Sequence, residues 1–190
     1  FQQGAQTAAS YFLASDEATA EAPLDFLDTR YIIVDAKTAV ASFHGVALWG
    51  QTSPANYFQT YTQHTPEGKT ERLVLYYPSY FQTMLARLFS FRAEAAEPEM
   101  YDVIRYTTSG RAEEERTISD LERFESYEEA QAYIEASKDL NVALVSASPF
   151  RPCVPIESMD GYSLVFESST EVQLFGKRVP EVRIFEYSGA

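Results

Sequence analysis

The sequence RYIIVDAKTAVASFHGVALWG, residues 30–50, changes from a strand pattern to a helix pattern at a single carboxylate, Asp35. Residues Tyr31 to Val34 are aromatic or β-branched, which favours a short buried strand. Residues 36–48 are rich in alanine, contain no proline and repeat larger apolar residues every three or four positions, as a helix with one buried face does. Asp35 can cap that helix by accepting backbone N–H groups of its first turn. It can instead be offered to a ligand, and the local sequence leaves both interpretations open.

The whole chain has 190 residues, of which 45% are hydrophobic, enough for one well-packed core. Helical patterns dominate the first half and strand patterns the second, which predicts an α+β fold rather than an alternating α/β fold. We expect residues 1–98 to form a mainly helical core that contains the Asp35 corner. Residues 99–190 are expected to form a β-rich part that completes the same globular unit.

The first half contains three further predicted segments. Residues 7–14 and 16–27 are expected to be short helices, the second capped by Ser15 and strained by Pro23. Residues 51–72 are predicted to be a long polar loop, whose aromatic residues either pack against the body or form a sugar-stacking platform. Residues 76–91 give the clearest helical stripe, with a proline in the first turn, and are predicted to be the core helix.

The second half reads mainly as strands. Strands are predicted over 101–108 and 141–148, and three more over 162–169, 173–180 and 181–190. The sequence GRAEEER, residues 110–116, is expected to be a solvated turn. Ser126 followed by Glu129 matches a capping box and predicts a helix over 126–137.

Composition excludes several classes of function. The formal charge of −13 would repel a nucleic acid, and the basic residues do not cluster, so no nucleic-acid partner is expected. One cysteine and two isolated histidines provide neither a disulfide nor a structural zinc site, so no metal or other cofactor is expected within this chain. No run of about 18 apolar residues could span a membrane. The start at Phe1 predicts a piece of a longer protein.

Motifs that identify common enzyme classes are absent, including GxSxG, HExxH and the phosphate-binding glycine loop. The chain contains so many carboxylates that a possible acid–base pair does not distinguish one class of enzyme from another. Arg87 lies beside the apolar stripe of residues 76–91, where it could form an ion pair, contact a ligand or extend to solvent. Asp35 is therefore the one distinctive position that the residues themselves provide.

Five sequence blocks together resemble the C-terminal extracellular domain of the archaeal oligosaccharyltransferase catalytic subunit, a dolichyl-phosphooligosaccharide-protein glycotransferase. Each block alone is weakly specific, but their order, spacing and ending are specific, and the resemblance spans nearly the whole chain. The blocks are RYIIVDAKTAVASFHGVALW (30–49), YYPSYFQTMLARLF (76–89), FESYEEAQAYIE (124–135), VPIESMDGYSLVFESS (154–169) and VPEVRIFEYSGA (179–190).

This resemblance implies a part of an enzyme of the cell membrane, with the domain on the extracellular face. In the family, a multi-spanning half binds a divalent cation, Mn or Mg, and transfers an oligosaccharide from a dolichol phosphate or diphosphate to Asn of an Asn-x-Ser/Thr sequon. The implied partners are the sequon-containing acceptor protein, the lipid-linked oligosaccharide and the membrane-spanning half of the same chain. The WWDYG signature that contacts the sequon hydroxyl residue is absent here, so the chain is expected to be catalytically inactive alone.

A second family motif begins with an aspartate on a kinked helix after a strand, and the resemblance places it at Asp35, Thr38, Ser42 and Val46. Asp35 and Val46 match the aspartate and the closing apolar position. Thr38 replaces the usual Lys or Met, with Lys37 one place away, and Ser42 replaces a lysine. The implied role is acceptor binding, with the carboxylate accepting from the sequon hydroxyl and Val46 contacting a threonine methyl. Thr38 and Ser42 can equally be read as ordinary helical residues.

A second function, from a different class, also fits the residues. The chain could be a non-enzymatic extracellular module that binds carbohydrate or another protein on a similar scaffold. An upstream WWDYG and about a dozen membrane spans would favour the enzyme, whereas a secretory signal directly before Phe1 would favour the module.

Overall fold

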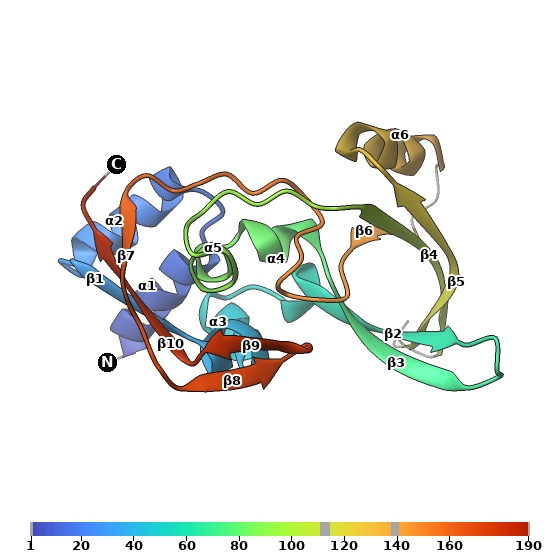
Figure 1. Cartoon of the computed structure of the whole chain (residues 1–190), viewed down its shortest axis with the longest axis horizontal. Coiled ribbons are helices and arrows are strands. Elements are labelled where there is room, and N and C mark those ends of the chain that lie inside the picture. Colours follow the sequence, from blue (N-terminus) through green and yellow to red (C-terminus); the bar gives the residue numbers. More distant parts are fainter. Residues whose placement is uncertain (1, 111–114, 138–140, 190) are drawn as a thin grey trace.

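The protein is an α+β chain in which helices predominate early and strands late (Figure 1). The structure is a computed structural model that describes residues 2–110, 115–137 and 141–189. The helices are α1 (Gln2–Leu13), α2 (Glu17–Phe26), η1 (Lys37–Ala41), α3 (Phe43–Trp49), η2 (Pro54–Asn56), α4 (Pro78–Gln82), α5 (Met84–Phe91) and α6 (Tyr127–Ser137). The strands are β1 (Tyr31–Asp35), β2 (Phe58–His64), β3 (Thr70–Tyr76), β4 (Tyr101–Ser109), β5 (Glu115–Phe124), β6 (Val142–Val145), β7 (Tyr162–Glu167), β8 (Glu171–Leu174), β9 (Lys177–Pro180) and β10 (Val182–Tyr187). The predicted fold class is confirmed.

Helix α5 forms the centre of the main core, and every residue in it except Ser90 is buried. The single helix predicted over 76–91 is wrong, because the chain breaks between α4 and α5 at Thr83. Thr83 is extended (φ −65°, ψ 143°), and its hydroxyl accepts from the Ala86 N–H at 3.2 Å while donating to the Tyr80 carbonyl at 2.7 Å. A buried threonine thus ends one helix and caps the next.

A three-stranded antiparallel sheet, in the order β1-β10-β7, lies beside α5 (Figure 1). Strand β1 pairs with β10 from Tyr31 opposite Glu186 to Asp35 opposite Val182. Its inward residues Ile32 and Val34 are buried, while its outward residues are exposed. The predicted strand before Asp35 is confirmed, and it is paired with the last strand of the chain.

A five-stranded sheet, in the order β3-β2-β5-β4-β6, forms the other end of the molecule and carries α6 on one face (Figure 1). The long loop predicted over 51–72 is wrong, since most of it is the hairpin of β2 and β3, which turns at Gly68 with φ +76°. Tyr61, within that segment, is fully buried, so this aromatic residue packs rather than forming a platform. Strand β5 was not predicted, and most of the charged turn predicted over 110–116 lies outside the described residues.

The ends of the other elements refine the predictions. Helix α1 begins at Gln2, earlier than predicted, and α2 is capped by Asp16 rather than Ser15, since Asp16 Oδ1 accepts from the Thr19 N–H at 2.7 Å. That bond also lowers the pKa of Asp16. Helix α2 continues through Pro23. Ser126 caps α6 as predicted, accepting from the Glu129 N–H at 3.2 Å.

None of the helices described has the length and apolar character needed to cross a membrane.

Candidate functional site

Asp35 ends β1 at the point where the chain turns into the π-helical segment η1. Its Oδ1 accepts from the Thr38 backbone N–H at 2.9 Å, and its Oδ2 accepts from the Thr38 hydroxyl at 2.7 Å. The carboxylate thus satisfies one free N–H of the first turn, as a capping residue does. It is half-buried, and these two bonds use only about half of the acceptor positions of a carboxylate. Capping therefore leaves Asp35 able to accept a further hydrogen bond.

The helix after Asp35 is kinked. Segment η1 has π-type hydrogen bonding, with Ser42 N–H donating to the Lys37 carbonyl at 2.7 Å, and Ser42 leaves helical geometry (φ −111°, ψ 12°) before α3 begins. Insertions of this kind bend a helix and often occur at functional sites. The single helix predicted over 36–48 is therefore two segments.

Among the four residues of the sequence motif, Asp35 and Thr38 are joined by hydrogen bonds of the Asp35 side chain. The Ser42 hydroxyl has no hydrogen-bond partner among residues 2–110, 115–137 and 141–189, and it caps neither segment. Val46 is half-buried and packs against the main core. The structure places all four on one stretch of chain, and it links two of them directly.

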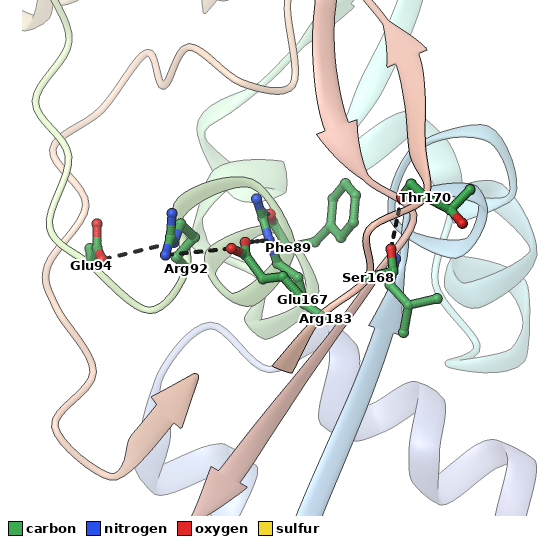
Figure 2. Close-up of polar contacts among 8 residues, drawn as sticks. Phe89, Arg92, Glu94, Glu167, Ser168, Thr170 and Arg183 are labelled. Atoms are coloured by element: carbon green, nitrogen blue, oxygen red, sulfur yellow. Dashed lines mark hydrogen bonds and ion pairs between the residues drawn. The ribbon is translucent and has the colours of Figure 1, made fainter. Parts of the chain in front are cut away.

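Charged residues on β10 and β7, the strands next to β1, form a connected group of polar contacts (Figure 2). Arg183, one residue beyond the partner of Asp35 on β10, is only 6% exposed. Its Nε donates to Glu167 Oε1 of β7 at 2.7 Å, and its Nη1 donates to the carbonyl of Phe89 near the end of α5. Burial lowers the pKa of Arg183, while Glu167 opposes that shift. Arg183 thereby ties β10 to both β7 and the core helix.

Two further contacts extend this group. Arg92, which ends α5 in the left-handed conformation (φ 63°), approaches the second Glu167 oxygen at 3.6 Å and Glu94 at 3.9 Å. On the other side, the Ser168 hydroxyl accepts from the Val182 N–H at 3.1 Å and donates to the Thr170 carbonyl at 2.8 Å (Figure 2). Val182 is the residue opposite Asp35, so these bonds hold the strand that Asp35 pairs with.

The sequence analysis did not identify Arg183 or Glu167. The signal was the alternation in VRIFEY, which places Arg183 on the same inward side as the buried Phe185. A charged residue at an inward strand position requires a partner, and Glu167 lies directly opposite. Arg87 is also buried, at 8% exposure, and its Nη2 donates to the Glu157 carbonyl at 3.2 Å.

No group of three or more His, Cys, Asp or Glu residues in the described part of the chain is arranged to hold a metal ion. The site at Asp35 consequently offers hydrogen-bond acceptance and an apolar contact.

Comparison with known proteins gave matches among solved structures alone. No protein-family model matches the chain. No curated protein matches it.

Solved structures that match include several of the oligosaccharyltransferase of Archaeoglobus fulgidus. The apo crystal structure is 16% identical over 95% of this chain, with a TM-score of 0.47. The structure of that enzyme, AglB, with an inhibitory peptide and a dolichol-phosphate is 17% identical over 95%, with a TM-score of 0.43. The structure tethered to an acceptor peptide containing the NVT sequon is 21% identical over 54%, with a TM-score of 0.40.

The enzyme in the apo crystal structure is much longer than this chain. The chain covers 22% of the length of that enzyme.

Proposed function

We propose that the chain is the C-terminal extracellular part of an archaeal-type oligosaccharyltransferase. In this role it helps to bind the Asn-x-Ser/Thr sequon of an acceptor protein, while the membrane-spanning half of the enzyme binds the lipid-linked oligosaccharide and a divalent cation. The observation that carries the proposal is the corner at Asp35, where a strand, a half-buried carboxylate and a kinked helix follow one another as the family motif requires.

The chemistry of the corner suits a hydroxyl ligand. The carboxylate oxygens of Asp35 are already oriented by Thr38, so a further donor meets an acceptor whose position is fixed. A hydrogen bond to a charged acceptor contributes about 1.5–3 kcal/mol, more than one between neutral groups. Val46 on the following helix supplies the apolar surface for a threonine methyl.

The proposal assigns Thr38 a positioning role that differs from that of the usual Lys or Met. Its hydroxyl and its N–H both bind the carboxylate, so it restricts the rotation of Asp35 instead of contacting the acceptor. Ser42 remains available for the acceptor, because its hydroxyl is not used by the described part of the chain.

The test uses the full-length enzyme with Asp35→Asn. Asparagine still caps a helix, so the fold should be retained while the negative charge is lost. We expect kcat/KM for an Asn-x-Thr peptide to fall by roughly 5- to 150-fold, equivalent to about 1–3 kcal/mol. Val46→Ala should have a smaller effect, larger for Asn-x-Thr than for Asn-x-Ser peptides, since only threonine has the methyl.

Asp16→Asn is the matched control. Asp16 also accepts from the N–H three residues later, at 2.7 Å, and it lies on a different helix. If kcat/KM is unchanged in both variants, Asp35 acts only as a helix cap, and its assignment to acceptor binding is refuted.

A second experiment tests whether catalysis requires the membrane-spanning half of the enzyme. The isolated 190-residue chain should transfer no glycan to a sequon peptide, since the implied metal ligands and the WWDYG residues lie outside it. Measurable transfer by this chain alone would overturn that part of the proposal.

A further inference from the structure

A second site lies away from Asp35, in a cleft with a volume of about 730 Å³. It is bounded by the extended segment after α5, by β4 and β5, by the chain after β6 and by the start of β9. Its volume falls within the usual range for ligand sites. None of Asp35, Thr38, Ser42 and Val46 lines it, so the proposed acceptor site does not account for it.

One wall of the cleft carries two cations without an acidic partner. Arg151 and Lys177 flank Phe150, and the Lys177 Nζ lies 6.0 Å from the centre of the Phe150 ring. Neither forms an ion pair with any residue that the structure describes, although the chain has 28 acidic residues and only 15 lysines and arginines. Arg123, in the same cleft, is paired with Asp102 at 2.8 Å. The Arg151 and Lys177 charges are therefore available to an external carboxylate.

The segment after α5 also lines the cleft, and Ala96 in it forms an isolated β-bridge. Ala96 exchanges both of its backbone hydrogen bonds with Ile156, each at 2.9 Å. In extended chain, the neighbouring residues direct their N–H and C=O groups to the other side. Those of Ala95 and Glu97 bind no backbone group among the described residues, and both residues line the cleft. Such an edge can accept an added strand.

The other residues that line the cleft disfavour some classes of ligand. The buried side chains of Phe91, Val145 and Phe150 give the cleft an apolar floor. Glu94, Glu97 and Glu99 disfavour a polyanion such as a nucleic acid, because like charges would face it across a few ångströms. A neutral oligosaccharide would leave both free cations without a partner.

We propose that this cleft binds an extended peptide segment that pairs its backbone with Ala95 and Glu97 and places one acidic side chain between Arg151 and Lys177. The free groups match this ligand, since a peptide supplies alternating backbone donors and acceptors together with a single carboxylate. The site does not depend on the proposed function of the chain. It would bind its peptide whether the protein is a glycosyltransferase part or an interaction module.

The test measures binding of two fluorescein-labelled heptapeptides to the 190-residue chain by fluorescence polarisation. One peptide has a central aspartate between alternating threonine and valine residues, and the other has asparagine in its place. We expect the aspartate peptide to bind roughly tenfold more tightly, and its advantage to shrink as salt is raised. Equal affinities, or no binding of either at millimolar protein, would overturn the proposal.

Variants of the chain locate the site. The double variant Arg151→Ala, Lys177→Ala should remove the advantage of the aspartate peptide, whereas Arg178→Ala should keep it. Arg178 is the matched control because it is an exposed cation next to Lys177 that does not line the cleft. If Arg178→Ala also removes the advantage of the aspartate peptide, net charge alone attracts the peptide and the proposal is refuted. Displacement of the peptide by a neutral oligosaccharide would indicate a carbohydrate site and would also refute it. If the double variant fails to fold, the contrast between the two peptides still decides.

Discussion

Arg183 and Arg30 offer a direct test of how burial sets the contribution of an ion pair. Arg183 lies in β10 and Arg30 directly precedes β1, so both belong to the region of the three-stranded sheet. Each binds a glutamate: Arg183 lies 2.7 Å from Glu167, and Arg30 lies 2.9 Å from Glu186. The Arg183 side chain is 7% exposed, however, and that of Arg30 is 72% exposed. Geometry is thus nearly constant between the two pairs while solvation changes.

We expect Arg183→Ala to destabilise the fold much more than Arg30→Ala. The substitution removes a charge-assisted bond to Glu167 and leaves the Phe89 carbonyl at the end of α5 without its donor. Each of these losses costs about 1–3 kcal/mol. Glu167 is 28% exposed and still has Arg92 at 3.6 Å, which reduces its penalty, so we expect a total loss of about 2–4 kcal/mol. Arg30→Ala should leave the free energy of unfolding unchanged within error.

Urea unfolding followed by circular dichroism would measure both variants at neutral pH, with the slope m checked for constancy. Arg183→Lys adds a second comparison: it retains the charge but not the fork that reaches Glu167 and Phe89 together, and it should recover only part of the loss. Equal effects of Arg183→Ala and Arg30→Ala would refute the reasoning.

Three further predictions follow from single contacts. Thr83→Ala should lower the free energy of unfolding by about 1–2 kcal/mol, since it removes the cap between α4 and α5, while Thr83→Ser should retain most of it, both measured by urea unfolding. Thr38→Val should cost about 1 kcal/mol, because the hydroxyl bond to Asp35 is lost and the N–H bond remains; an unchanged urea midpoint would contradict this. Burial raises the pKa of Tyr76 and of Tyr162 to about 12, above their ordinary value near 10, so their contribution to stability is complete below pH 10 and is lost as the pH rises toward 12. Absorbance at 295 nm should show that these phenols do not ionise near pH 10 while the protein is folded.

The strand and corner at Asp35 were predictable because their signals are local. A β-branched run fixes a buried strand, and an aspartate before an alanine-rich segment fixes a helix start, without reference to the rest of the chain. The prediction that Ser126 caps α6 was correct for the same reason. The kink at Ser42 was expected from the family motif alone.

The hairpin of β2 and β3 was missed because β2 and the turn that follows it contain few apolar residues. Tyr61 and Leu75 are buried, while much of the surrounding sequence is polar and partly exposed. Its turn signal, a proline and a glycine in TPEG (65–68), was read as evidence for a loop when it joins two strands. The break at Thr83 was missed for another reason: an apolar stripe continues across it, so periodicity cannot reveal that the backbone is extended there.

The pairing of Arg183 with Glu167 could not have been assigned from either segment alone. Alternation in β10 indicates a buried charge, but many glutamates could neutralise it, and the choice depends on which strand lies opposite. The same holds for Thr38, which the sequence left open between an acceptor-binding residue and an ordinary helical residue. The hydrogen bond of its hydroxyl to Asp35 could not be assigned from the sequence.

The pairing of β1 with β10 has a consequence for biosynthesis. Tyr31 to Asp35 leave the ribosome well before Val182 to Glu186, which are their only strand partner among the described residues. Contacts between distant parts of a chain form slowly, since the intervening chain must first be ordered. The sheet that holds Asp35 therefore cannot close until Val182 to Glu186 have been synthesised. A chain that stops before Val182 would carry every residue of the family motif and still lack the strand that positions its aspartate.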